Sequence, residues 1–529
     1  MHEQAQRAEA LQPGAAAEWP AGWKWALAAI LLATAVVFVA GATSHIVLGD
    51  EVYHTLFARA WSEAGLANRP THNPLYASGE PPGYYYVTEP VWPMLLGLAW
   101  QATGSVPWVA QAYQALWYAL VLALVWALGR DLLGPRGALA AVLAAISIPM
   151  VGAFSVMLYV DTAATAVILA AVVLLLRRHY FWAGVLVGLA YVTKRNTAFL
   201  VPPMVLWIVL QEGSLWQRAR RAGLFLLPAV LVVLPDLWWR RHWIPGASDP
   251  VNPAHLLARL TTFFSPQRLS SNVNNPIHLL MYLGCVMPLL AAAYVARRAW
   301  EKADRWLWVF IAFYVVILLV MFTLDTDVRY VMPIVPLFTV MVARGLRGWW
   351  NKRWVPVALT AVAFAQLGVS AVRVNLARRL TPGQQAVFAY LRTHTPEGTR
   401  VMYPGEVIQV EARRPVVWNH LTDPETGKTC LPAFLLETDP QKILNLLRSN
   451  EVAYLCVEEG RILSGPLAKA ERGGYPRTFV DNLPALPFLE KVAGPWRGTI
   501  TLWKVKGDFR WPARDAPGTD IPPPLERSP

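Results

Sequence analysis

The chain opens its ordered part with KWALAAILLATAVVFVAGATSHI, Lys24 to Ile46, and continues almost at once with GDEVYHTLFARAW, Gly49 to Trp61. The first stretch has the length and composition of a membrane-spanning helix. The residues before it are polar and rich in Ala and Pro, unlike the start of a cleavable signal, so we expect a retained span. The second stretch places two adjacent carboxylates, Asp50 and Glu51, where this helix reaches water.

Two interpretations of these acids are open. Asp50 is a suitable helix cap, and Glu51 would then lie in the first turn, where negative charge suits the helix dipole. Alternatively, one of the two is a catalytic base. Val52, Tyr53, Phe57 and Trp61 predict a short helix lying in the membrane interface, with its aromatic rings at the level of the headgroups.

Composition supports a membrane protein. The 529 residues are 55% hydrophobic and 15% charged, with a mean hydropathy of +0.35, whereas a soluble domain carries about 25% charged residues. The net charge of +13 comes largely from bases in short loops between apolar runs. This is the pattern of a multi-pass membrane protein, and we expect no nucleic-acid partner.

The apolar runs predict an all-α polytopic protein with about eleven transmembrane helices. After the first span, the expected spans are Trp108 to Leu128, Ala138 to Phe154, Thr162 to Leu176, Phe181 to Val192, Thr197 to Leu210, Ala222 to Trp239, Ile277 to Val295, Trp306 to Leu324, Tyr330 to Ala343 and Val355 to Val372. Phe181 to Val192 and Thr197 to Leu210 are short and separated only by TKRN, so they predict a helical hairpin that lines a cavity.

The bases fall in alternate loops, which predicts a cytoplasmic N-terminus and a plasma-membrane location with the C-terminal part outside. We expect a disordered cytoplasmic tail over 1–23, a transmembrane catalytic domain over 24–373 with a large outer loop over 48–107, and a disordered tail over 508–529. Between them, 374–507 predicts a small extracytoplasmic α/β domain.

In that C-terminal part, the pattern predicts a helix over Gln384 to Thr393, a strand over Arg400 to Tyr403 and a closing strand over Thr499 to Val505. Cys430 and Cys456 lie there, and whether they pair is left open.

The first outer loop contains NPLYASGEPPGYYYV, Asn73 to Val87. Its Pro and Gly residues forbid regular structure, and Tyr84 and Tyr85 carry rings with hydroxyl edges that suit a sugar. An interfacial aromatic belt is the alternative. Glu80 adds a third carboxylate to this loop.

Charged residues recur at the outward ends of later spans. Asp161, in MLYVDTAA, is either a helix cap or a functional acid, since acids at membrane depth are expensive. Lys194 and Arg195, in TKRN, require an anion, and a phosphate would supply it unless Asp161 or Asp50 does. Arg329, in LDTDVRYVMPIVPL, either joins a phosphate clamp or pairs with a nearby aspartate.

Together these residues predict one outward-facing cavity that binds a lipid-phosphate sugar donor entering from the bilayer. Its phosphate would meet the cations and its sugar the tyrosines. A carboxylate would deprotonate the attacking hydroxyl of a glycan, lipid or protein acceptor.

The same motifs, in the same order, resemble the GT-C superfamily of integral-membrane glycosyltransferases, which use polyprenyl- or dolichyl-phosphate sugars. The acid pair, GEPPGYYY, YVDTA, GLAYVTKRN and RYVMPIVP carry the resemblance over Lys24 to Arg373. Within this superfamily, the chain is similar to the protein O-mannosyltransferase and aminoarabinose transferase branch. DEVYH, PPGYYYV, YVDTA and KRNTAF also look like motifs of the dolichyl-phosphate-glucose α-1,2-glucosyltransferase family.

The resemblance implies site roles that composition does not. Asp50 matches the aspartate regarded as base, with Glu51 beside it, and Asp161 matches the second-loop acid. Three bases, Lys194, Arg195 and Arg329, match those thought to handle the donor phosphate.

The resemblance leaves metal dependence open. Some members bind a divalent metal near the first loop, and here Asp50, Glu80, His54 and His255 are the candidate ligands. Glu80 stands where aminoarabinose transferases carry Lys, which argues against their donor and against a copied metal site.

A transporter or flippase of a lipid-linked or anionic substrate is the alternative function, and a scaffold that displays the C-terminal domain is another. A transporter predicts ionisable residues near the bilayer midplane and pseudo-repeated halves. Here the charges gather at one outer face and no repeat is evident, so the sequence favours sugar transfer.

Overall fold

The computed structural model describes residues 22–42, 45–46, 50–65, 89–243, 309–314, 328–346, 349, 352, 354–405, 407–418, 421, 423–426, 430–463, 474–492 and 500–509. In the described residues of the membrane part, every regular element is a helix. Its elements are α2 (Gly22–Ala42), α3 (Asp50–Ala64), α4 (Val91–Thr103), α5 (Pro107–Ile146), α6 (Pro149–Val156), α7 (Val160–Leu176), α8 (Tyr180–Thr193), η1 (Arg195–Leu200), α9 (Val201–Val209), α10 (Leu215–Trp243), η2 (Val328–Ile334), α16 (Val335–Gly345) and α17 (Trp354–Ala377).

Within the described residues, α2, α5, α10 and α17 are long and apolar enough to cross a membrane. Helices α6 and α7, bent by 117° at their break, form either a broken span or a re-entrant loop. A break in α5 at Gly134 (φ 78°, ψ 177°) turns it into a hairpin. A Cβ on Gly129 would lie 2.8 Å from the Cα of Ala138, so the two halves pack closely. The predicted spans Trp108 to Leu128 and Ala138 to Phe154 fall on the two sides of this break, and the second is interrupted between Ile146 and Pro149, where α5 ends and α6 begins.

The predicted span Ile277 to Val295 lies outside the described residues, as does most of Trp306 to Leu324. The count of eleven therefore stays a prediction. The short hairpin is present: α8 ends at Thr193, Lys194 is extended (φ −159°, ψ 114°), and η1 leads into α9.

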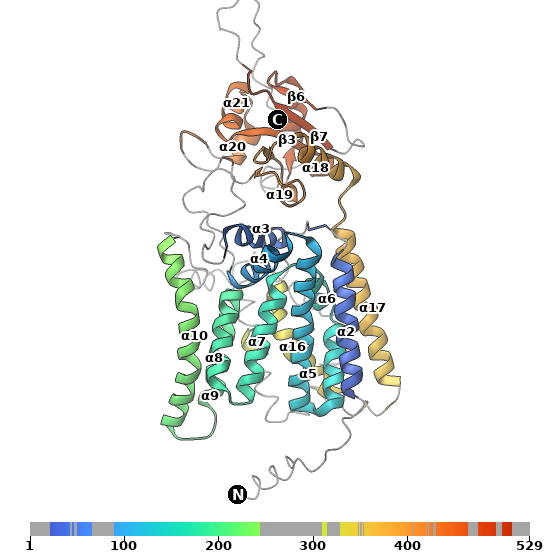
Figure 1. Ribbon diagram of the computed structural model, residues 1–529, viewed down its shortest axis with the longest axis vertical. Helices are drawn as coiled ribbons and strands as arrows, with labels where there is room; N and C mark the ends of the chain where they lie inside the picture. Colours follow the sequence, from blue (N-terminus) through green and yellow to red (C-terminus); the bar gives the residue numbers. More distant parts are fainter. Residues whose placement is uncertain are drawn as a thin grey trace, which may run out of the picture.

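Helices α3 and α4 lie across one end of the long helices, between them and the C-terminal sheet (Figure 1). They pack closely, since a Cβ on Gly97 would lie 2.7 Å from both the Ala58 carbonyl oxygen and the Trp61 Cβ. The predicted helix after Asp50 is thus present. The predicted place of its aromatic rings is wrong for two of them, because Phe57 and Trp61 are buried in protein.

The C-terminal residues form a second core, separate from that of the membrane helices. Its five-stranded sheet has the order β2-β1-β3-β7-β6, in which β1, β2 and β3 are parallel and β7 is antiparallel to β3 and β6. The elements are α18 (Pro382–His394), β1 (Arg400–Met402), α19 (Val407–Glu411), β2 (Val416–Val417), α20 (Leu431–Leu436), α21 (Pro440–Ser449), β3 (Val452–Glu458), η3 (Glu459–Arg461), β4 (Ile462–Leu463), β5 (Tyr475–Pro476), α22 (Arg477–Asn482), η5 (Leu483–Ala485), β6 (Leu489–Lys491) and β7 (Ile500–Val505).

Several of these elements lie where the sequence pattern predicts them. Helix α18 has a capping box formed by Thr381 and Gln384, and β1 and β7 match the predicted strands within a residue at each end. The sheet contacts the membrane part through α19, whose Glu411 Oε2 lies 3.1 Å from His45 Nδ1. Helix α19 itself packs on α3.

A buried ion pair joins the end of α17 to α3. Glu51 and Arg378 are 0% and 1% exposed, and Arg378 Nε donates to Glu51 Oε1 at 3.1 Å. Arg378 Nη2 donates to the carboxylate and, at 3.0 Å, to the Val156 carbonyl, while the Leu158 amide donates to Glu51 Oε2 at 3.3 Å. This group, the Glu51–Arg378 clasp, fixes the start of α3 to the break between α6 and α7.

Breaking the clasp by Arg378→Ala should cost about 3–5 kcal/mol in the free energy of unfolding, because Glu51 is left as an uncompensated buried charge. Unfolding of the purified protein in mixed micelles, followed by tryptophan fluorescence, measures this. Arg177→Ala is the control: its partner Asp131 is 2.7 Å away, but the two side chains are 40% and 30% exposed, so the cost should stay within about 1 kcal/mol. Equal costs for the two variants would contradict the clasp.

Cys430 and Cys456 are both free thiols, so they do not form a disulfide with each other. Burial, with a smaller effect of Asp423, raises the pKa of Cys430 to about 11, and burial in β3 raises the pKa of Cys456 well above its usual range. Both should therefore react slowly with iodoacetamide at pH 8 in the native protein and readily after denaturation. A disulfide-linked peptide containing both residues would refute this.

Candidate active site

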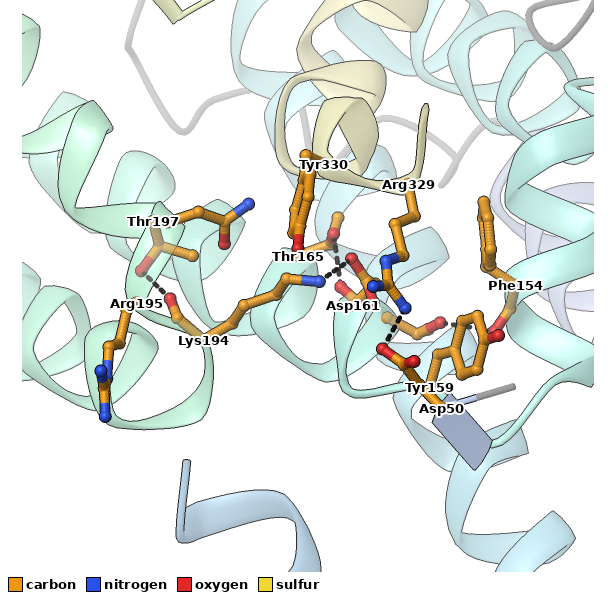
Figure 2. A network of polar contacts seen from close by, with 12 residues as sticks. Asp50, Phe154, Tyr159, Asp161, Thr165, Lys194, Arg195, Thr197, Arg329 and Tyr330 are labelled. Carbon is orange, nitrogen blue, oxygen red and sulfur yellow. Dashed lines mark hydrogen bonds and ion pairs between the residues drawn. The ribbon is translucent and has the colours of Figure 1, made fainter. Parts of the chain in front are cut away.

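Two ion pairs lie side by side where α3, α7, the α8–η1 turn and η2 meet (Figure 2). Arg329 Nη1, from η2, donates to Asp50 Oδ2 at the first residue of α3. Lys194 Nζ, from the hairpin tip, donates to Asp161 Oδ1 in the first turn of α7. The predicted first outer loop, the predicted outward ends of two later spans and the hairpin tip thus meet at one place.

Tyr330 connects the two pairs. Its ring centroid lies 4.6 Å from Lys194 Nζ and 5.3 Å from the Arg329 guanidinium carbon, and the latter is also 5.4 Å from the Tyr159 ring. Each such contact contributes about 0.5–2 kcal/mol. Both cations are thus held beside the same aromatic ring.

The two pairs differ in their access to water. The side chains of Lys194 and Asp161 are 10% and 1% exposed, whereas those of Arg329 and Asp50 are 17% and 23% exposed. Asp161 is therefore enclosed with its lysine, and Asp50 is the acid that an incoming molecule reaches first.

Several buried polar atoms around the pairs have no hydrogen-bond partner among the described residues. They are Asp161 Oδ2, His54 Nδ1 and Asn196 Oδ1. An unsatisfied buried polar atom costs about 1–3 kcal/mol. Three of them around one pair of cations indicate a place built for a polar ligand.

The protonation states follow from the surroundings of α3. Burial acts to raise the pKa of Asp50, but the positive charges around it, Arg329 foremost, hold that pKa below its ordinary value of 3.8. Burial lowers the pKa of His54 to about 4, which outweighs the opposite effect of Asp50. At neutral pH the site therefore holds a carboxylate and a neutral imidazole one helical turn apart.

Glu51, the second carboxylate of the predicted catalytic pair, points into the clasp, where both of its oxygens accept hydrogen bonds. Its clasp partner, Arg378, was not among the predicted residues. The signal was available: Arg378 and Arg379 follow an apolar span at its outward end, against the positive-inside bias, as Lys194 and Arg195 do.

Arg195 does not lie with Lys194. Its side chain points away from the Lys194 ammonium (Figure 2), its Nε is 3.8 Å from Glu89 Oε1, and its backbone amide donates to the same oxygen at 3.4 Å. Glu89, which follows the proline-rich loop, was not among the predicted residues either.

Other predicted residues are not placed. Glu80, Tyr84, Tyr85 and His255 lie outside the described residues. For the suggested divalent metal this leaves only Asp50, which pairs with Arg329, and His54. No group of three or more His, Cys, Asp or Glu suited to a metal exists in the described part of the chain. The described part of the chain therefore offers no set of metal ligands. The possible divalent metal stays a prediction.

The chain resembles known proteins over part of its sequence and over most of its fold. Residues 87–239 match the model of the dolichyl-phosphate-mannose-protein mannosyltransferases. No curated protein sequence matches the chain. Among solved structures, ArnT from Cupriavidus metallidurans bound to undecaprenyl phosphate is similar, with 15% identity, a TM-score of 0.60, and coverage of 91% of this chain and 98% of that chain.

The oligosaccharyltransferase of Archaeoglobus fulgidus is similar as well. AglB in complex with an inhibitory peptide and a dolichol-phosphate matches at 12% identity and a TM-score of 0.55, over 92% of this chain and 75% of that one. A structure of the same enzyme with Zn and sulfate matches at 13% identity and a TM-score of 0.53, over 81% and 68%. At these identities the structures establish a shared fold. Together with the mannosyltransferase match, they confirm the resemblance of this multi-helix membrane protein to the GT-C superfamily of glycosyltransferases.

Proposed function

We propose that the protein transfers a hexosyl or pentosyl group from a polyprenyl-phosphate donor to an acceptor hydroxyl, with inversion, at the outer face of the membrane. The observation that carries the proposal is the meeting of two acids and two cations around Tyr330. The relatives crystallised or imaged with undecaprenyl phosphate and dolichol-phosphate support a lipid-linked donor.

The cations suit the donor phosphate. Arg329 offers a planar fork and Lys194 a point charge, and both lie beside one ring. Their charges stabilise the phosphate as it leaves, so that no strong general acid is needed. Asp161, enclosed with Lys194, holds the ammonium in place and contributes through it.

Asp50 suits the base. It is ionised and lies at the more exposed side of the site, where an acceptor hydroxyl arrives. One base and one leaving group give a single displacement, in which the acceptor attacks the face of the sugar opposite the phosphate. Glu51, through the clasp, fixes the first turn of α3 and so the position of Asp50.

The remaining predicted residues complete the proposal. His54 contacts the sugar with its buried ring nitrogen. Contacts of Tyr84, Tyr85 and Glu80 with the sugar stay a prediction from the sequence, because these residues lie outside the described ones. Arg195, on its own side of the hairpin tip, lies beside Glu89 and takes no part in binding the phosphate in this proposal. In this proposal the N-terminus is cytoplasmic, and the site and the C-terminal sheet lie outside the plasma membrane.

The transferred sugar is identified by mass spectrometry of surface glycans from cells with and without the protein. We expect one hexose or pentose per acceptor unit to disappear when the protein is removed. Identical glycans, with the flux of a lipid-linked substrate across the membrane altered instead, would favour a transporter.

Asp50→Asn should lower the rate of transfer by roughly 10²–10⁴, because the loss of a general base costs that much. The initial rate in membranes carrying equal amounts of each variant measures this. Asp131→Asn, which removes an acid paired with Arg177 away from the site, serves as the control and should leave the rate unchanged. Transfer by Asp50→Asn at the wild-type rate would exclude Asp50 as base.

Lys194→Ala should weaken the binding of undecaprenyl phosphate by about tenfold or more, because a charge-assisted contact contributes about 1.5–3 kcal/mol. The dissociation constant of the purified full-length variant gives the effect. An unchanged constant in a folded variant would refute the phosphate role of Lys194.

A further inference from the structure

The pairing of Asp50 with Arg329 conflicts with its role as a base. A carboxylate oxygen that accepts a hydrogen bond from a guanidinium is a weak proton acceptor, because an incoming proton has to displace that contact. In the unliganded protein the proposed base is therefore inactive. Some event must separate Asp50 from Arg329 before transfer.

Arg329 is able to change partners. Its guanidinium lies over the Tyr159 and Tyr330 rings, 5.4 and 5.3 Å from their centroids, and these contacts hold it in the site whatever anion faces it. Its fork matches a phosphate as well as a carboxylate. The pair is also open to water on one side, with 17% and 23% of the side chains exposed.

The neighbouring pair is not suited to such a change. Asp161 is 1% exposed, and its removal from Lys194 would leave a carboxylate with no access to water. Lys194 therefore stays with Asp161 and offers its remaining donors to the ligand. Of the two pairs, only the one that contains the proposed base is built to exchange.

We propose that the donor phosphate and Asp50 compete for Arg329, so that binding of the donor releases the base. This inference rests on the proposed function and adds to it the order of events. Arg329 first neutralises Asp50. When the lipid phosphate arrives between Arg329 and Lys194, the guanidinium turns to it, and the Asp50 carboxylate is free to meet the acceptor.

In the transfer step, one bond to the anomeric carbon forms as another breaks. The acceptor hydroxyl gives its proton to Asp50 as its oxygen bonds to the anomeric carbon. The bond from that carbon to the phosphate oxygen breaks, and its electron pair stays on the phosphate beside Arg329 and Lys194. Asp50 next loses its proton to water, Arg329 returns to it, and the polyprenyl phosphate product leaves.

If Asp50 and the phosphate compete for Arg329, loss of the Asp50 charge should raise the affinity for the phosphate. Asp50→Asn removes the internal competitor, so undecaprenyl phosphate should bind the purified full-length variant about tenfold more tightly than wild type, within the 5–150-fold range typical of coupled binding. The same variant should transfer the sugar roughly 10²–10⁴ times more slowly. A base that only touches the acceptor would leave the affinity for this product unchanged.

The controls isolate the exchange. Asp131→Asn removes an arginine-paired aspartate elsewhere and should not change the affinity, and undecaprenol, which lacks the phosphate, should not distinguish wild type from Asp50→Asn. Thermal unfolding checks that each variant is folded. If Asp50→Asn does not fold, Asp50→Ser removes the same charge and should show the same tighter binding.

The outcomes separate this inference from the function on which it rests. Equal or weaker binding by a folded Asp50 variant, when wild type binds undecaprenyl phosphate, overturns the exchange alone. Failure of folded wild-type protein to bind undecaprenyl phosphate at all overturns both the donor assignment and the exchange.

Discussion

The site depends on the Glu51–Arg378 clasp. A buried ion pair adds little net stability, but once formed it is expensive to break, because each charge has lost its water. Here the pair binds three segments that the chain brings from far apart: the start of α3, the break between α6 and α7, and the end of α17. Asp50 precedes Glu51 directly, so the clasp fixes the turn from which the proposed base projects.

The same clasp connects the site to the C-terminal sheet. Arg378 follows α17 and precedes α18, and α19 rests on α3 one layer above the site (Figure 1). A displacement of the sheet would therefore act on α3 from two sides.

Burial separates the ion pairs into two kinds. Glu51–Arg378 and Asp161–Lys194 are enclosed and serve as fixed supports, whereas Asp50–Arg329 faces the opening of the site. A fixed pair gives geometry, and an accessible pair gives a contact that a charged ligand replaces. The sugar-transfer proposal uses both kinds, since a displacement needs positioned groups and a base that is free at the right moment.

The sequence predicted those residues whose charge conflicts with their surroundings. Asp161, Lys194 and Arg329 each interrupt or border an apolar run, and such charges have few explanations other than a polar site. The helix after Asp50, the hairpin at TKRN and the elements α18, β1 and β7 followed from periodicity and turn residues.

The features that the sequence did not reveal are contacts between side chains that lie far apart along the chain. Nothing local shows that Glu51 would turn to Arg378 rather than to a substrate, or that adjacent Lys194 and Arg195 would face different acids. Phe57 and Trp61 have the spacing of an interfacial stripe, but α4 covers them. Pairings between distant segments require the fold.

The most direct measurement is an experimentally determined structure of the protein with undecaprenyl phosphate bound. The account predicts the phosphate within hydrogen-bond distance of both Lys194 Nζ and the Arg329 guanidinium, with Asp50 no longer in contact with Arg329. A phosphate bound elsewhere, with the Asp50–Arg329 pair intact, would contradict it.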